Sequence, residues 1–229
     1  MQRRPLNREM LKGIACITMV LDHIGAVFLP WDGLRVIGRV SFPIFCFLLA
    51  EGAHYTRKPG RYALRLLGVA VLAELPYDYL FFGGLHWGHQ SAMLTLLIGL
   101  GTLWGMTQWH RWQMLIIAVG YLLAEVLRAD YGGLGVLLIC LFCVTRELRR
   151  GSAVQVAAMA VLFWLMGSYP VDLFGLSVPI QLFGMMAVLP IVCYSGRACV
   201  LKAWVKWGFY LFYPAHLALL LGVRWILKD

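Results

Sequence analysis

Charged side chains are scarce in this chain: Asp, Glu, Lys and Arg together make up 14% of its 229 residues. An ordinary soluble domain carries about 25% of these residues, and a disordered chain is poor in apolar ones. This composition, with 61% hydrophobic residues, therefore excludes both classes. The sequence also lacks an internal repeat, a low-complexity segment and any connection long enough to hold a separate soluble domain.

Long apolar runs take up most of the chain. A helix needs about 20 mostly apolar residues to cross the hydrocarbon core of a bilayer, and nine segments approach that length. We therefore predict an all-α fold, a polytopic integral membrane helical bundle of nine transmembrane helices, or eight if one short segment does not cross. The bundle is expected to form a single domain over residues 1–229. The predicted spans are 10–29, 36–54, 63–82, 92–109, 113–128, 131–146, 153–169, 178–195 and 208–226.

The positions of Lys and Arg predict the orientation of these spans, because cytoplasmic loops carry an excess of both. With a cytoplasmic N-terminus, 15 of the 20 basic residues fall on the inner side and 5 on the outer side. We therefore expect a multi-pass protein of the plasma (inner) membrane, surrounded by membrane lipids. The same bias accounts for most of the net charge of +9, so no nucleic acid is expected as a partner.

Polar residues inside the predicted spans are the best pointers to function. An ionisable side chain at the bilayer centre costs at least about 2.5–3.5 kcal/mol, so it persists where it is paired or faces a wet cavity. Eight ionisable residues tend toward the outer half of the membrane: Asp22, His23, Arg35, Arg39, Glu74, Asp78, His86 and His89. Glu51 tends toward the cytoplasmic half, beside four basic residues: Arg57, Lys58, Arg61 and Arg65. Together these residues suggest a polar path across the membrane, with basic residues at its cytoplasmic end.

Structural explanations remain open for several of these residues. Asp22, Arg39 and Glu51 could form an ion cluster that locks helices together, and His23 could be a satisfied core histidine. The four basic residues are explained equally well by the inside excess of Lys and Arg. Adjacent helical positions point about 100° apart, so Asp22 is not expected to hold the His23 ring directly. Glu51 or Glu74 from another helix is an equally good partner for that ring.

The polar residues stand in motifs that resemble those of the TraX family, named for the membrane protein that acetylates the N-terminus of conjugative F-type pilin. The matching stretches are Leu11–Gly25, which includes Asp22-His23, then Gly38-Arg39-Val40-Ser41-Phe42-Pro43, Glu51-Gly52 and Glu74-Leu75-Pro76-Tyr77-Asp78. The order is similar to that of a wider group of integral-membrane acyltransferases, which includes acyltransferase family 3 and heparan-glucosaminide N-acetyltransferase. Tyr213-Pro214-Ala215-His216 is similar to the end of that group's core.

The resemblance implies a membrane-bound acetyltransferase that uses cytosolic acetyl-CoA as co-substrate. The acceptor would be an amine or hydroxyl at the outer face, on a peptide N-terminus, a sugar or another small molecule. His23 would be the catalytic base or acyl carrier, Asp22 its neighbour in the site, and Arg39 a binding or oxyanion-stabilising residue. Acyl transfer from a thioester needs such a base and such cations.

Further residues complete the predicted site. Arg57, Lys58, Arg61 and Arg65 suit the phosphates of a cytosolic CoA donor, and Arg35, Asp78, Tyr213 and His216 are additional polar candidates. His86 and His89 stand three apart in a glycine-rich loop, but no third ligand stands nearby, so no metal site is expected.

Two other functions would produce a similar pattern. A small secondary transporter or proton-coupled exchanger also carries acidic and basic groups inside the membrane. It usually shows an internal repeat with broken helices at matching positions, whereas here the polar residues gather in the first third of the chain. A structural membrane partner of an assembly is the third possibility, and it predicts that His23→Ala leaves function intact.

Overall fold

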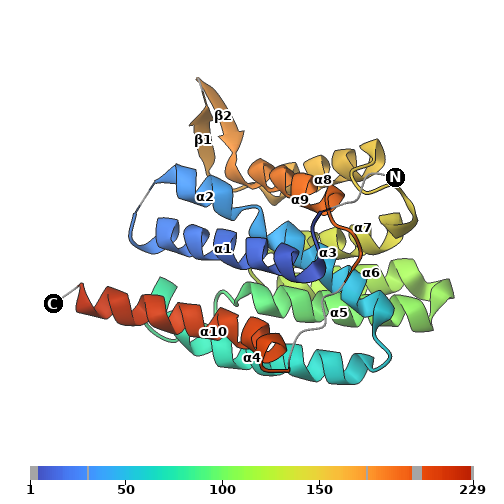
Figure 1. Cartoon of the computed structure of the whole chain (residues 1–229), viewed down its shortest axis with the longest axis horizontal. Helices are drawn as coiled ribbons and strands as arrows, with labels where there is room; N and C mark the ends of the chain where they lie inside the picture. Colours follow the sequence, from blue (N-terminus) through green and yellow to red (C-terminus); the bar gives the residue numbers. More distant parts are fainter. Residues whose placement is uncertain (1–4, 30, 174, 198–202, 228–229) are drawn as a thin grey trace. The chain divides into compact units, whose positions relative to one another are not determined.

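The computed structural model describes residues 5–227 of the chain, apart from residues 30, 174 and 198–202. Figure 1 shows a predominantly helical chain. Its α-helices are α1 (Arg8–Val27), α2 (Asp32–Gly38), α3 (Ser41–Tyr55), α4 (Pro59–Phe81), α5 (Ala92–Gln108), α6 (Gln113–Val126), α7 (Gly132–Val144), α8 (Ala153–Met166), α9 (Val188–Val192) and α10 (Ala203–Ile226). Short 3-10 helices are η1 (His110–Trp112), η2 (Thr145–Glu147) and η3 (Ile180–Ala187).

Each of the nine predicted spans overlaps helical structure in the described chain. The second predicted span is divided between α2 and α3, with Arg39 and Val40 at the junction. The eighth begins as η3 and continues as α9. Periodicity alone does not mark such junctions, because apolar residues continue through them.

Three helical stretches in the described part of the chain are long and apolar enough to cross a membrane: Arg8–Val27, Asp32–Tyr55 and Trp207–Ile226. Shorter apolar helices cover Ala92–Gln108, Ala153–Met166 and Ile180–Val192. Helix α4 has 23 residues but carries Arg61, Arg65, Glu74 and Asp78 along its length. The chain is thus a helical membrane protein, and the count of eight or nine spans and their orientation stay predictions.

A β-hairpin departs from the all-α prediction. Strands β1 (Pro170–Leu173) and β2 (Leu176–Pro179) pair antiparallel, with Val171 opposite Val178. The Asp172 carboxylate accepts a hydrogen bond from the Gly175 backbone N–H at 2.8 Å, and Gly175 has a φ of +85°, which glycine adopts without strain. The prediction missed this hairpin because two four-residue strands are too short to show an alternating pattern.

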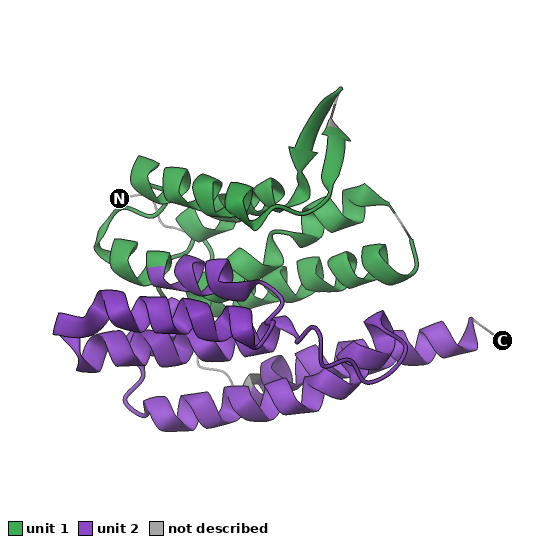
Figure 2. Ribbon diagram, turned by 180° about the vertical axis from the view of Figure 1, so that it is seen from behind, with its two compact units in different colours: residues 1–48, 141–200 green, residues 49–140, 201–229 purple. Residues whose placement is uncertain are grey.

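The chain divides into two compact units, each built from two separate stretches of sequence (Figure 2). Unit 1 comprises residues 1–48 and 141–200, and unit 2 comprises residues 49–140 and 201–229. The single domain over residues 1–229 stays a prediction.

In unit 1, α1 packs on α2, and η3 packs on both α2 and α8. Helix α1 begins at an Asn7 cap, whose side chain accepts from the Met10 N–H at 2.8 Å. Leu11 and Ala15 of α1 are fully buried, and the Ala15 carbonyl accepts from the Ser41 hydroxyl at 2.9 Å. That bond joins the start of α3 to the middle of α1.

In unit 2, α4 packs along α10 and also against α5, which in turn packs on α6. The Arg65 guanidinium lies 5.5 Å from the centre of the Tyr210 ring, and Arg224 donates to the Leu80 carbonyl. Early residues of α4 therefore meet early residues of α10, and late residues meet late ones. The two helices run in the same direction, side by side in Figures 1 and 2.

Candidate functional site

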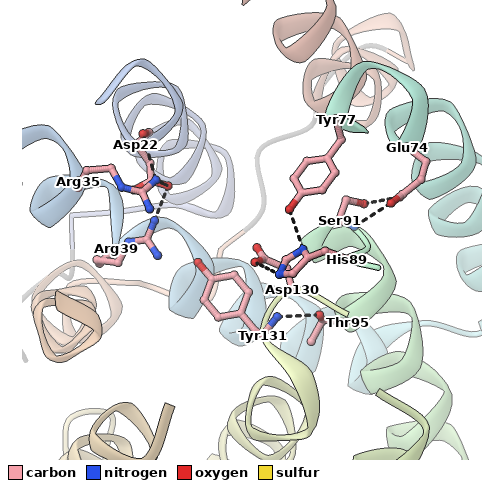
Figure 3. Close-up of polar contacts among 10 residues, drawn as sticks. All are labelled: Asp22, Arg35, Arg39, Glu74, Tyr77, His89, Ser91, Thr95, Asp130 and Tyr131. Atoms are coloured by element: carbon pink, nitrogen blue, oxygen red, sulfur yellow. Dashed lines mark hydrogen bonds and ion pairs between the residues drawn. The ribbon is translucent and has the colours of Figure 1, made fainter. Parts of the chain in front are cut away.

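An ion cluster joins α1 and α2 in unit 1 (Figure 3). The Asp22 carboxylate accepts from Arg35 Nη1 at 3.0 Å and from Arg39 Nη2, both through its Oδ2 atom. Asp22 and Arg39 are each 8% exposed, whereas Arg35 is half-buried. One carboxylate thus faces two guanidinium groups.

Gly38 lets α2 approach α1 closely enough for this cluster to form. A Cβ atom built on Gly38 would overlap the Asp22 side chain, and one on Gly25 would lie 2.9 Å from the Leu34 Cβ. The second carboxylate oxygen, Asp22 Oδ1, is buried and has no hydrogen-bond partner among the described residues. It faces the Gly38 position, so the glycine rather than a polar group fills the space beside it.

Gly38→Ala tests this close approach. We expect the added methyl group to destabilise the protein by about 1–3 kcal/mol, the usual cost of overpacking a filled interior. Gly13→Ala on α1 is the matched control, because a Cβ atom there meets nothing within 4 Å. Thermal unfolding in detergent measures both, and equal midpoints for the two variants would contradict the packing argument.

His23 follows Asp22 near the C-terminal end of α1, and it is half-buried. The Asp22 carboxylate is engaged by Arg35 and Arg39, so the structure places it with the cations rather than with its neighbour. Asp22 and Arg39 therefore form an ion pair, and whether its role is structural or catalytic stays open. Glu51, the third member of the predicted ion cluster, is 4% exposed and belongs to unit 2.

A second polar cluster lies in unit 2, where the end of α4 meets the loop before α5. The Glu74 carboxylate accepts from Ser91 twice, from its backbone N–H at 3.0 Å and from its hydroxyl at 2.8 Å. Asp78, one turn further along α4, accepts from the His86 N–H at 3.0 Å. The other oxygen of the Asp78 carboxylate is buried without a hydrogen-bond partner among the described residues.

The same loop places His89 between two side chains (Figure 3). His89 Nδ1 lies 3.1 Å from the Tyr77 hydroxyl, and its Nε2 lies 3.6 Å from Asp130 Oδ1. Two backbone contacts bring these segments together: Gln90 N–H donates to the Arg128 carbonyl at 2.9 Å, and Tyr131 N–H donates to Thr95 at 3.4 Å. A tyrosine, a histidine and an aspartate from three segments of unit 2 thus form one chain of contacts.

The C-terminal candidates lie on α10. Tyr213 is 5% exposed and lies near Ser91, Glu74 and Asp130. His216 is buried, and its Nδ1 lies 2.9 Å from the Phe212 carbonyl. A carbonyl only accepts, so Nδ1 carries the hydrogen in this contact. Tyr213 therefore joins the unit 2 cluster, whereas the described contact of His216 is within its own helix.

The four basic candidates begin in the turn before α4 and continue along its first turns. All of them are exposed, and Arg65 lies over the Tyr210 ring: Arg57, Lys58, Arg61 and Arg65. The structure therefore groups most of the predicted site residues in three places, one in unit 1 and two in unit 2, and leaves Glu51 and His216 outside these groups.

Several polar contacts involve residues that the sequence alone did not select. Tyr77, Ser91 and Asp130 stand next to predicted residues in the unit 2 cluster, and the sequence places His89 on the outer side of the polar path without indicating its partners. One feature of the sequence could have indicated this cluster. His86 and His89 lie in a glycine-rich loop, outside any apolar pattern. Within the described chain, no group of three His, Cys, Asp or Glu side chains is placed to hold a metal ion.

These features define a helical membrane protein with buried ionic clusters close to histidines. The family model described as TraX protein matches residues 7–224, so the chain belongs to the TraX family. This confirms the family resemblance found in its motifs.

Curated relatives extend over nearly the whole chain. It is 26% identical to the probable fimbrial assembly protein FimC, serogroup H1, of Dichelobacter nodosus, over 95% of this chain and 96% of that protein. It is also 26% identical to Protein TraX of Escherichia coli, over 94% of this chain and 86% of that protein. An uncharacterised Rickettsia prowazekii protein is 37% identical over 35% of this chain and 31% of its own length. No solved structure matches the chain significantly.

Proposed function

We propose that this protein is a membrane-embedded acyltransferase that moves an acetyl group from cytosolic acetyl-CoA to an acceptor at the outer face of the membrane. The observation that carries the proposal is the buried cluster of Asp22, Arg35 and Arg39 next to His23. The cluster brings the N–H donors of two guanidinium groups, one buried and one half-buried, to one place. Such a site favours the oxyanion that develops when a nucleophile attacks a thioester carbonyl.

The residues have separate roles in this proposal. Asp22 holds the two guanidinium groups in place, so they need no reorganisation when charge develops. Arg35, at 22% side-chain exposure, reaches the edge of unit 1, and Arg39 supports it from inside. His23, half-buried on the same helix, serves as base or acyl carrier.

An amine of a protein N-terminus is the favoured acceptor among those considered. One relative is named a fimbrial assembly protein, and the family shares its name with Protein TraX; resemblance to that family implies pilin acetylation. Both names support a pilin-associated role for this chain. A sugar amine or a hydroxyl would fit the chemistry but has no support in the names of the relatives.

The donor's phosphates are proposed to bind at the start of α4. Arg57, Lys58 and Arg61 are exposed there, and the N-terminus of a 23-residue helix adds its own positive dipole end. In the predicted topology this end faces the cytosol, where acetyl-CoA is found. The acyl arm would then extend into the membrane toward the polar residues.

The double variant Arg57→Gln/Arg61→Gln tests this donor site. We expect the Kd for acetyl-CoA to rise about tenfold, which corresponds to about 1.4 kcal/mol for two exposed charges. The matched control is Arg111→Gln/Arg149→Gln, two exposed arginines that are also on the predicted inner side. Isothermal titration at low salt measures both, and an equal Kd for the two double variants would remove the donor site from the start of α4.

The first test of the function itself is acetyl-CoA binding by the purified protein in detergent, with thioester cleavage followed in the same samples. Saturable binding with release of free CoA supports the acyltransferase. Absence of binding up to millimolar acetyl-CoA would contradict it. Proton-driven uptake assays in liposomes would then test the transporter, which is the alternative.

A further inference from the structure

We propose that Tyr77, His89 and Asp130 form a proton relay that removes the proton from an ammonium acceptor before acetyl transfer. This inference rests on the proposed acyltransferase function and assigns the acceptor step to unit 2. Asp130 Oδ1, the His89 ring and the Tyr77 hydroxyl follow one another at 3.6 and 3.1 Å. The order carboxylate, imidazole, hydroxyl is the one that activates hydroxyl groups in hydrolases.

The hydrogen positions follow from the partners. An ionised carboxylate only accepts, so His89 Nε2 carries its hydrogen toward Asp130. The neutral ring then has Nδ1 as its acceptor, and the Tyr77 hydroxyl donates to it. The lone pairs of the Tyr77 oxygen are left to accept from a third group, and this is where an ammonium N–H would bind.

The relay runs from the interior to the surface of unit 2. Tyr77 is 7% exposed, whereas the side chains of His89 and Asp130 are 39% and 35% exposed. A proton accepted at the buried hydroxyl therefore has a continuous path to a half-exposed ring and carboxylate. A hydrogen bond with a purely structural role would not need this increase in exposure from Tyr77 to His89 and Asp130.

The surroundings of Tyr77 suit a cation. Glu74, Asp130, Tyr131 and Tyr213 all interact electrostatically with the Tyr77 side chain. Two carboxylates and two further tyrosines offer charge, oxygen acceptors and aromatic faces, all of which attract an ammonium group. The loop that carries His89 also lies on the predicted outer side, where the acceptor is expected.

In the proposed step, the acceptor loses its proton before it attacks the thioester. The ammonium gives one proton to the Tyr77 oxygen while the Tyr77 hydrogen moves to His89 Nδ1, and Asp130 stabilises the imidazolium. The free amine attacks the thioester carbonyl, so the C–N bond forms and the C–S bond breaks. The CoA sulfur leaves and takes the second amine proton, giving the free thiol. His89 then loses its proton to water.

Two nucleophiles of different protonation state test the relay. Glycinamide is largely protonated at neutral pH and needs a base, whereas hydroxylamine is largely unprotonated and does not. We expect Tyr77→Phe and His89→Gln to lower acetylation of glycinamide about tenfold at pH 7, because roughly a tenth of an α-amine with a pKa of about 8 is unprotonated there without the relay. Acetylation of hydroxylamine should stay close to the wild-type rate. Chromatography of the labelled products from acetyl-CoA measures both.

Matched controls separate the relay from local structure. Tyr79→Phe changes an exposed tyrosine two residues further along α4, and His86→Gln changes an exposed histidine of the same loop. Both should acetylate glycinamide like the wild type. Acetyl-CoA binding and the thermal midpoint of each variant report whether it is folded.

Three results would overturn the relay. The first is unchanged glycinamide acetylation in His89→Gln and Tyr77→Phe, and the second is an equal loss with both nucleophiles, which would indicate a structural role. The third is a wild type that binds acetyl-CoA but does not acetylate glycinamide. Failure of the wild type to bind acetyl-CoA is a different outcome, because it removes the proposed function itself.

Discussion

Asp22→Asn is expected to destabilise the protein by about 3–5 kcal/mol, the cost of leaving a buried charge without its counter-ion. The substitution keeps the size and shape of the side chain but removes its charge. Arg39, 8% exposed, and the half-buried Arg35 would then face each other across an uncharged amide. Both guanidinium groups point at the same oxygen of Asp22, so neutralising that carboxylate weakens two ion pairs at once.

Unfolding can be followed through the cysteines of unit 1. Cys16 and Cys46 are buried, so a thiol-reactive dye reports their exposure as SDS or heat unfolds the protein in detergent. Asp32→Asn is the matched control, because Asp32 is an exposed aspartate at the start of α2 in the same unit. It should change stability by less than about 0.5 kcal/mol.

A double variant separates lost charge pairing from lost packing. Asp22→Asn/Arg39→Met removes the buried positive charge together with its partner and keeps an apolar side chain of similar length. It should recover part of the stability lost in Asp22→Asn, because the two substitutions act on one ion cluster. If Asp22→Asn is as stable as Asp32→Asn, the ion cluster does not stabilise the protein electrostatically as the structure indicates.

The sequence predicted the helices of this protein better than their contacts. Apolar runs mark where α1, α5 and α10 lie, because burial in lipid or protein requires those residues whatever the partner. Polar residues within the runs marked Asp22 and Arg39 as important. The sequence did not indicate that Asp22 would bind both arginines, 13 and 17 residues further along, since that depends on how Gly38 lets α2 approach α1.

The proposed relay in unit 2 shows a different limit of prediction from sequence. His89 lies in a loop, and a loop has no periodicity that says where a side chain points. Its contact with Asp130 depends on the Gln90 bond to Arg128, which joins segments about 40 residues apart. Arg128 reaches that bond with a φ of 52°, a left-handed conformation that few residues other than glycine adopt. Nothing in the local sequence of either segment predicts the pairing.

Family membership adds information that neither the sequence motifs nor the structure supplies alone. Asp22 and His23 both lie within the part of the chain that the TraX family model matches. The structure then gives Asp22 a role as the anchor of two cations and gives a second histidine, His89, its own carboxylate. The two histidines are therefore expected to differ in function, and the test of His23 must separate them.

His23→Gln is expected to lower acetyl transfer about 10²–10⁴-fold while acetyl-CoA binding persists. Glutamine keeps the size and hydrogen-bonding capacity of the side chain but neither takes up a proton near neutral pH nor carries an acyl group. The loss should affect glycinamide and hydroxylamine alike, unlike that of His89→Gln, because either nucleophile needs His23 in the transfer step, whether as base or as acyl carrier. His54→Gln is the matched control, since His54 is an exposed histidine on α3.

Mass spectrometry of the protein after brief exposure to acetyl-CoA distinguishes the two roles left to His23. An acetyl group on His23 that disappears when amine is added indicates an acyl carrier, and hydrolysis without such an adduct indicates a base. Either result fits the proposal, because both require the imidazole ring. Transfer by His23→Gln at the rate of His54→Gln would not fit, and the cluster of Asp22, Arg35 and Arg39 would then be a structural lock between α1 and α2.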